Sequence, residues 1–136
     1  MRLNIIRKSP AEIEAMKEAG RLSAYVLRKV GEAAKPGVST LELDELAETL
    51  IRAEGGTPAF KGYGGFPGSI CASVNDQIVH GIPSSKAILR EGDILSIDTG
   101  ATVDGWVGDN AWTYPIGKVS RDVAMLLETT EKCMWA

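Results

Sequence analysis

An Asp-Gly dipeptide between two runs of strand-forming residues is the feature that most constrains how this chain can fold. Asp104-Gly105 follows Ile-Asp-Thr-Gly-Ala-Thr-Val and precedes Trp-Val-Gly-Asp-Asn-Ala-Trp-Thr. Such a dipeptide favours a two-residue hairpin loop, which fixes the pairing of the flanking strands. Val103 would then pair with Trp106, and Asp98 and Asp109 would lie diagonally across the ribbon on one face. Because like charges held that close repel each other, a bound cation is the expected reason for holding them together.

The first strand of this hairpin alternates as a half-buried strand should. Its expected core face carries apolar residues, namely Leu95, Ile97, Ala101 and Val103. Its other face carries polar or small residues, namely Ser96, Asp98, Gly100 and Thr102. An ordinary amphipathic hairpin with two exposed aspartates is the alternative, and a one-residue bulge would move one aspartate to the opposite face. The hairpin alone leaves both interpretations open.

Composition places the chain among ordinary globular domains. Its 136 residues are 44% hydrophobic and 24% charged, and 15 basic against 18 acidic residues give a net charge of −3. No basic patch stands out, so we expect no nucleic-acid binding. We also expect no membrane span and no secretory signal, because no apolar run is long enough for either. Cys71 and Cys133 form neither a metal-binding nor a disulfide motif, so a cytoplasmic protein is expected.

Two capping boxes predict where two helices begin. Ser9-Pro10-Ala11-Glu12 starts a helix that ends at Lys35-Pro36-Gly37, and Ser39-Thr40-Leu41-Glu42 starts one that ends at Gly55-Gly56. Each helix has an apolar stripe that we interpret as core. The stripes consist of Ile13, Met16, Ser23, Val26, Leu27 and Val30 in the first helix, and of Leu43, Leu46, Ala47, Leu50 and Ile51 in the second.

The remaining segments predict a loop, a second hairpin and a third helix. Residues 60–68, Phe-Lys-Gly-Tyr-Gly-Gly-Phe-Pro-Gly, form a loop able to bring backbone close to a ligand. Residues 69–74 and 77–80 predict two short strands around the turn Asn75-Asp76, and a helix is expected from Ser120 to the end. The order helix, helix, hairpin, hairpin, helix predicts an α+β fold with an antiparallel sheet, in one unit spanning residues 1–136.

Several side chains near these turns could take part in chemistry. His80, the only histidine, is either a hydrogen-bonded structural residue or a group that exchanges protons and donates to a developing oxyanion. Cys71 has no charged neighbour in the sequence to lower the pKa of its thiol, so we expect it to pack or to line a pocket. Tyr63 and Phe66 either line an apolar pocket or anchor the loop.

Three segments stand in a characteristic order. They are residues 71–83 (Cys-Ala-Ser-Val-Asn-Asp-Gln-Ile-Val-His-Gly-Ile-Pro), 92–98 (Gly-Asp-Ile-Leu-Ser-Ile-Asp) and 104–109 (Asp-Gly-Trp-Val-Gly-Asp). Together with residues 60–67 and the Ser-Pro-x-Glu helix start, they closely resemble type I methionine aminopeptidase over essentially the whole chain. That resemblance implies a pita-bread fold, in which two pseudo-symmetric α+β halves surround a dinuclear metal centre. It also implies removal of the initiator methionine from nascent polypeptides.

The resemblance implies roles for single residues. Asp98 would bind one metal ion and Asp109 would bridge two, and their hard oxygen atoms suit Mn²⁺, Fe²⁺ or Co²⁺, with Zn²⁺ as a further candidate. The two ions would activate a water for attack on the first peptide bond. His80 would contact the substrate near that bond without binding metal. The pocket for the methionine side chain would include Phe60, Tyr63, Phe66 and Cys71, since an apolar pocket suits a flexible thioether.

The other metal ligands of that family, one histidine and two glutamates, lie in a C-terminal half that has no counterpart here. We therefore expect this chain to be the N-terminal half of such an enzyme, truncated in its last helix, weak in metal binding and inactive alone. After Asp109 the only acidic residues are Asp122, Glu128 and Glu131. The missing half would leave apolar surface exposed and available for self-association, including Trp106, Trp112 and Trp135.

Two alternatives to the enzyme are a non-catalytic pita-bread half-domain, acting as a binding or interaction module, and a metastable fragment without a function of its own. The presence of Asp98, Asp109 and His80 argues against the module, because a domain freed from catalysis has no use for them. Prolidase-type relatives share the two aspartates, but the segment from Cys71 to Pro83 favours the methionine enzyme.

Overall fold

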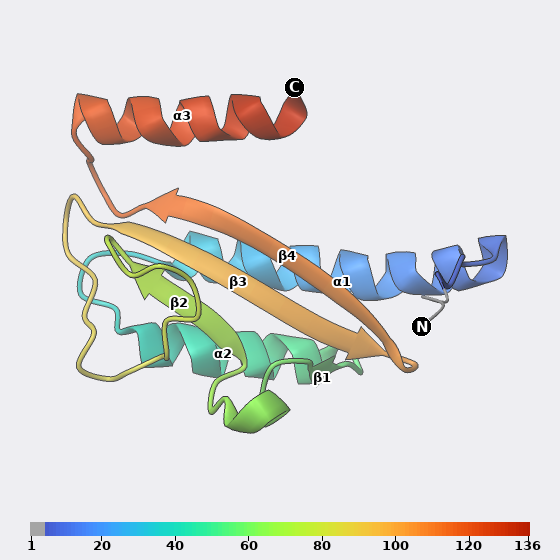
Figure 1. The fold of residues 1–136 in the computed structure, drawn as a ribbon. Helices are drawn as coiled ribbons and strands as arrows, with labels where there is room; N and C mark the ends of the chain where they lie inside the picture. The colour runs from blue at the N-terminus through green and yellow to red at the C-terminus, as the bar shows by residue number, and fades with distance from the viewer. Residues whose placement is uncertain (1–4) are drawn as a thin grey trace.

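The fold combines helices with an antiparallel sheet, as the order of elements predicts. The computed structural model describes residues 5–136, so the first four residues of the N-terminal segment lie outside the described residues. Two long helices, α1 (Pro10–Ala33) and α2 (Thr40–Ala53), cover one face of the sheet (Figure 1). Across the described residues, no helix is long and apolar enough to cross a membrane.

The sheet has a long central strand with partners on both edges. β3 (Ile94–Val103) pairs along its whole length with β4 (Trp106–Pro115). Its other edge pairs with β1 (Thr57–Pro58) and β2 (Ile70–Val74), and every pairing is antiparallel. A short 3₁₀ helix, η1 (Tyr63–Gly65), precedes β2, and α3 (Arg121–Trp135) follows β4. The α+β class with an antiparallel sheet is confirmed.

Both long helices begin at the predicted capping boxes. The hydroxyl oxygens of Ser9 and Ser39 accept hydrogen bonds from the N–H groups of Glu12 and Glu42, and each glutamate accepts one from the N–H of its serine. The predicted stripe of α2 is buried or half-buried, and so is that of α1 from Ser23 onward. Ile13 and Met16 correct the prediction: they are exposed, because the first turns of α1 run past the tip of the β3–β4 hairpin (Figure 1).

The β3–β4 hairpin has the predicted register. Val103 pairs with Trp106, Asp98 lies opposite Ala111 and Gly100 lies opposite Asp109. The φ angles of the two loop residues are 49° and 82°, as a loop of this type requires. Leu95, Ile97 and Ala101 are fully buried against the helices, whereas Ser96 and Asp98 lie on the other face. The predicted hairpin and its two faces are confirmed.

The second predicted hairpin is wrong. β2 pairs with β3, so that Cys71 lies opposite Asp98, and residues 77–80 form no strand. Val79 and His80 have φ angles of 46° and 53°, which interrupt an extended chain. The turn residue Asn75 bonds instead to Ile94 at the start of β3, through both its backbone and its side chain.

α3 stands apart from the rest of the fold, as Figure 1 shows. Its predicted start is confirmed, since the Ser120 hydroxyl oxygen accepts a hydrogen bond from the Val123 N–H. None of its residues is buried, and Met125, Leu126, Met134 and Trp135 are more than half exposed. Of the three tryptophans expected on an exposed surface, only Trp135 is largely exposed, because Trp106 and Trp112 are half-buried.

Candidate metal centre

Asp98 and Asp109 lie side by side on the polar face of the sheet. The pKa of Asp98 rises to about 6, first because the carboxyl group is partly buried and then because the negative charge of Asp109 lies close to it. One carboxyl oxygen of Asp98, Oδ1, is buried and has no hydrogen-bond partner. An unpaired buried acceptor beside a like charge is costly. A cation between the two side chains would remove both costs.

These two side chains therefore fit a divalent metal ion. Carboxylate oxygens are ligands that Mn²⁺, Fe²⁺ and Co²⁺ accept, and Asp98 Oδ1 is free to bind one. Within residues 5–136, no group of three or more histidine, cysteine, aspartate or glutamate side chains is placed to hold a metal ion. Asp98 and Asp109 are thus a pair of candidate ligands rather than a closed cage.

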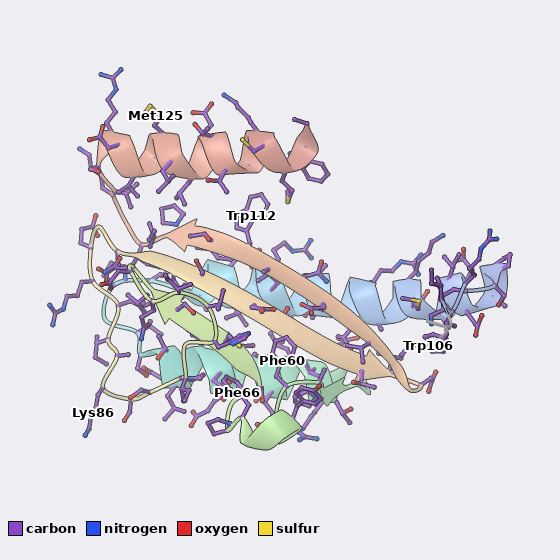
Figure 2. The ribbon with its side chains drawn as sticks, viewed as in Figure 1. Phe60, Phe66, Lys86, Trp106, Trp112 and Met125 are labelled. Carbon is purple, nitrogen blue, oxygen red and sulfur yellow. The ribbon has the colours of Figure 1, made fainter. Side chains whose placement is uncertain are left out.

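A cavity of about 690 Å³ opens beside Asp98, between the polar face of the sheet and α3. Trp112 points from the edge of β4 toward α3 (Figure 2) and forms part of its wall. The strands contribute small and polar groups beside a few large apolar ones, and α3 contributes apolar groups together with two glutamates and a threonine. The lining includes Cys71, Ser73, His80, Asp98 and Thr113 on the sheet side and Ala124, Leu127, Glu131 and Met134 on α3.

Cys71 lines this cavity and lies opposite Asp98 in the β2–β3 pairing. Burial, and after it the negative charges of Asp98 and Asp109, together raise the pKa of its thiol to about 11. Since the reactive species of cysteine is the thiolate, this side chain is not a nucleophile at neutral pH. Its position suits the wall of a pocket, and that role stays a prediction.

His80 lies at the rim of the same cavity, close enough to Asp98 to affect its titration. Its side chain is exposed, and the next residue fixes its position. The Gly81 N–H donates to Ser73 Oγ at 3.0 Å, and the Ala72 N–H donates to the Gly81 carbonyl at 2.9 Å. A Cβ atom on Gly81 would lie 2.4 Å from the Ala72 carbonyl oxygen, so only glycine fits. Ser73 was not among the predicted site residues, although a polar residue within a buried strand is a signal for such a role.

The predicted aromatic residues occupy the loop between α2 and β2, where Figure 2 labels Phe60 and Phe66. The ring of Phe60 lies on Gly100, where a Cβ atom would come within 2.4 Å of Phe60 Cε1. Because Gly100 lies opposite Asp109, Phe60 reaches the face that carries the two aspartates. Phe66 is half-buried, whereas Tyr63 is 82% exposed. None of the three lines the cavity, so the structure brings only Phe60 close to the carboxylates.

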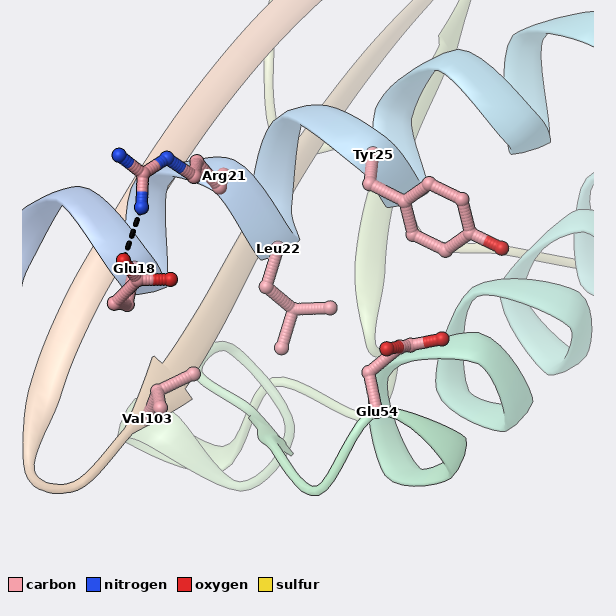
Figure 3. A pocket seen from close by; sticks show the side chains of 6 residues that line it. All are labelled: Glu18, Arg21, Leu22, Tyr25, Glu54 and Val103. Atoms are coloured by element: carbon pink, nitrogen blue, oxygen red, sulfur yellow. Dashed lines mark hydrogen bonds and ion pairs between the residues drawn. The ribbon is translucent and has the colours of Figure 1, made fainter.

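A smaller cavity of about 380 Å³ lies among α1, the end of α2 and the end of β3 (Figure 3). Leu22 and Val103 are its apolar wall, and Tyr25 and Glu54 stand at its side. Its Glu18 and Arg21 form an ion pair, so they neutralise each other. We therefore place the candidate site on the face that carries Asp98.

The sequence model of metallopeptidase family M24 matches residues 14–136. The chain belongs to metallopeptidase family M24. Its resemblance to methionine aminopeptidase is also confirmed. It is 52% identical over 131 residues to methionine aminopeptidase 1 of Bacillus subtilis (strain 168), a match that covers 96% of this chain and 52% of that relative.

Solved structures of methionine aminopeptidases have the same fold as this M24 chain. The enzyme of Rickettsia prowazekii superposes with a TM-score of 0.92 at 36% identity, over 96% of this chain and 53% of that one. The enzyme of Thermotoga maritima gives 0.90 at 40% identity, over 94% and 52%. The predicted half of a pita-bread fold is therefore confirmed. The chain spans about half the length of the curated relatives it matches.

Asp98→Asn is expected to stabilise this M24 chain when no metal is bound. The pKa of Asp98 in the folded chain, about 6, lies above its ordinary value of 3.8, so the folded state binds the proton more tightly than the unfolded state. Protonation of Asp98 therefore adds to the free energy of unfolding. This contribution is fully present below about pH 4 and is lost as the pH rises through about 6. The shift corresponds to at most about 3 kcal/mol, which solvent screening reduces to about 1–2 kcal/mol.

Urea denaturation in the presence of a chelator measures this effect. At about pH 7.5 the midpoint for Asp98→Asn should exceed that of the unsubstituted chain, and at about pH 3.5 the two should coincide. The control is Asp104→Asn, which removes an exposed carboxylate from the turn of the same hairpin and should change neither midpoint. If Asp98→Asn and the unsubstituted chain had the same midpoint at about pH 7.5 as well as at about pH 3.5, the predicted carboxylate repulsion would be contradicted.

Proposed function

We propose that this chain supplies the aspartate-bearing part of a methionine aminopeptidase active site, which removes the initiator methionine from nascent polypeptides in the cytoplasm. The observation that carries the proposal is the unpartnered Oδ1 of Asp98, buried beside Asp109. The relatives named methionine aminopeptidase support the substrate class.

Asp98 and Asp109 would hold two divalent metal ions, with Asp109 between them. Bound there, such ions supply Lewis acidity and a water-derived nucleophile for the first peptide bond. The two carboxylates themselves provide the negative charge that keeps the ions in place, and the β3–β4 register fixes their spacing. Manganese, iron, cobalt and zinc are the candidates, since carboxylate oxygens do not choose among them.

His80 would contact the substrate near the bond that is cleaved. It stands at the rim of the cavity, held by the bonds of Gly81 to Ser73 and Ala72. An imidazole in that position can donate a hydrogen bond to the carbonyl oxygen of the scissile bond, where negative charge develops. His80 would therefore orient the substrate and stabilise charge without binding metal.

The methionine side chain would be bound by the loop and strand beside the carboxylates. Phe60, Phe66 and Cys71 supply apolar and polarisable surface, which suits a flexible thioether. Phe60 and Cys71 both lie against β3 within the region of Asp98 and Gly100. Tyr63, which is largely exposed, would contribute from the outer end of the loop.

The ligands that complete the centre would come from a C-terminal half, so the chain alone should be inactive. The test mixes the purified chain with the part of Bacillus subtilis methionine aminopeptidase 1 that follows the matched region. With Mn²⁺ or Co²⁺, methionine release from a Met-Ala-Ser peptide should be undetectable for either polypeptide and measurable for the mixture. Robust release by the pure chain would contradict the predicted inactivity. A mixture that neither binds metal nor releases methionine would contradict the proposed enzymatic function.

A non-catalytic binding module is the second candidate. It is favoured by the apolar residues that α3 leaves exposed and by β4, which pairs with β3 alone among the described strands. Sedimentation velocity of the isolated chain separates the candidates. Tight self-association together with failure of the mixing experiment would favour the module.

A further inference from the structure

We propose that Asp44 and Glu48, one turn apart on α2, are positioning residues for the substrate pocket, because they hold both ends of the loop formed by residues 60–68. The proposal rests on the proposed function only in naming this loop as a pocket wall. Neither residue lines the cavity, so both would act through the loop rather than on the substrate.

Asp44 holds the C-terminal end of the loop. The residue is only 5% exposed, and a single carboxylate oxygen, Oδ1, accepts hydrogen bonds from the N–H groups of Ser69 at 2.6 Å and Ile70 at 2.9 Å. Burial raises the pKa of this carboxyl group, while the two bonds lower it. A carboxylate placed in the buried stripe of a helix is costly unless its hydrogen bonds repay the loss of water. Asp44 therefore fixes the first residues of β2.

Glu48 holds both ends of the loop at once. Its Oε2 accepts from Lys61 Nζ at 2.5 Å and from Ser69 Oγ at 3.3 Å, while its Oε1 accepts from Arg52 Nε at 2.9 Å. Lys61 and Arg52 lower the pKa of Glu48 to about 2, so this carboxylate is charged at every physiological pH. Lys61 follows Phe60 directly, and Ser69 stands two residues before Cys71.

These contacts connect α2 to the residues beside the metal face. Phe60 packs on Gly100, and Cys71 lies opposite Asp98. Within the loop, the Gly62 N–H donates to the Phe66 carbonyl at 2.8 Å, so a backbone hydrogen bond joins the two arms of the loop. A shift of either end would change the space between Phe60, Cys71 and the carboxylates. The two α2 carboxylates would thus set how well the pocket discriminates methionine from side chains of another shape.

The test compares Asp44→Ala with Asp44→Asn, which retains the accepting oxygen, and with Glu45→Ala, which removes an exposed carboxylate from the next position of α2. In the isolated chain, amide hydrogen exchange at Ser69 and Ile70 should accelerate at least about tenfold in Asp44→Ala. In Asp44→Asn and in the Glu45→Ala control, the exchange rates should equal those of the unsubstituted chain. Glu48→Gln, which keeps the shape of the side chain, should accelerate exchange at Ser69 and serves if Asp44→Ala does not fold. Unchanged exchange rates in Asp44→Ala and in Glu48→Gln would overturn the proposal.

The second measurement uses the complemented mixture and compares kcat/KM for Met-Ala-Ser with that for Leu-Ala-Ser. Asp44→Ala should lower the ratio of the methionine value to the leucine value by about tenfold, because a misplaced pocket wall loses discrimination of that size. The change should come from a higher KM for the methionine peptide. A loss of folded protein alone would lower both values and leave the ratio unchanged, which would overturn the positioning role. If the mixture has no activity with the unsubstituted chain, the proposed function fails, and hydrogen exchange still decides whether the two carboxylates hold the loop.

Discussion

Asp109→Asn is expected to lower methionine release by the complemented mixture by more than about a hundredfold. Asparagine keeps the shape of the side chain but loses the negative charge with which Asp109 would bind both metal ions. Groups that merely orient a metal ligand are worth about 10- to 100-fold, so loss of a bridging ligand should cost more. The measurement is kcat/KM for a Met-Ala-Ser peptide at saturating Mn²⁺.

Asp104→Asn is the matched control for that variant. It removes a carboxylate from the same hairpin, at a turn position with a φ of 49° that asparagine also favours, and it should leave kcat/KM unchanged. Asp109 is exposed, so its replacement should not lower the urea midpoint. Activity of Asp109→Asn within tenfold of the unsubstituted mixture would show that this aspartate does not bridge the metal ions.

Gly108→Ala is expected to destabilise the isolated chain by about 2–3 kcal/mol. A Cβ atom at this position of β4 would lie 2.2 Å from the carbonyl carbon and oxygen of Ala19 in α1. Backbone cannot move aside as a flexible side chain can, so α1 and the hairpin would have to separate, and overpacking of this kind costs about 1–3 kcal/mol. Equilibrium urea denaturation in chelator should show the lower midpoint.

Gly20→Ala is the control for this packing prediction. Gly20 lies in α1 near the same contact, but a Cβ atom there would meet no atom within 4 Å. Alanine should therefore raise stability by about 0.5–1 kcal/mol through helix propensity alone. Equal midpoints for Gly108→Ala and the unsubstituted chain would mean that α1 does not lie directly on β4.

The hairpin that carries the aspartates could be predicted because its information is local. Asp104 and Gly105 determine the loop type, and a two-residue loop leaves one possible register. The diagonal placement of Asp98 and Asp109 follows from that register without any knowledge of the rest of the fold. The helix starts were equally local, since Ser9 and Ser39 each stand three residues before a glutamate.

The second hairpin could not be predicted in the same way. Asn75 does form a turn, but the partner of β2 is β3, and the bonds of Asn75 to Ile94 favour that pairing over one with residues 77–80. The left-handed conformation of Val79 could not be predicted, because β-branched residues rarely adopt it. Asp44 did have a signal that was overlooked, because it stands next to Leu43 in the buried stripe of an amphipathic helix.

The aspartate pair destabilises the free chain, and we expect it to be useful only when metal is bound. The same burial that leaves Asp98 Oδ1 without a partner raises the pKa of Asp98 and weakens the fold at neutral pH. A locally destabilising arrangement is expected at a site where ligand binding stabilises the folded state. Metal binding should therefore increase stability most at the pH where both carboxylates are charged.

Titration of the ¹⁵N-labelled chain with substoichiometric Mn²⁺ tests the central claim most directly, because a paramagnetic ion broadens the signals of nearby amides. The account predicts selective broadening at Asp98 and Asp109 and at Cys71, which lies opposite Asp98, with loss of this pattern in Asp109→Asn and its retention in Asp104→Asn. Selective broadening centred on Glu128 and Glu131 of α3, or uniform broadening over the surface carboxylates, would contradict a metal site on the hairpin.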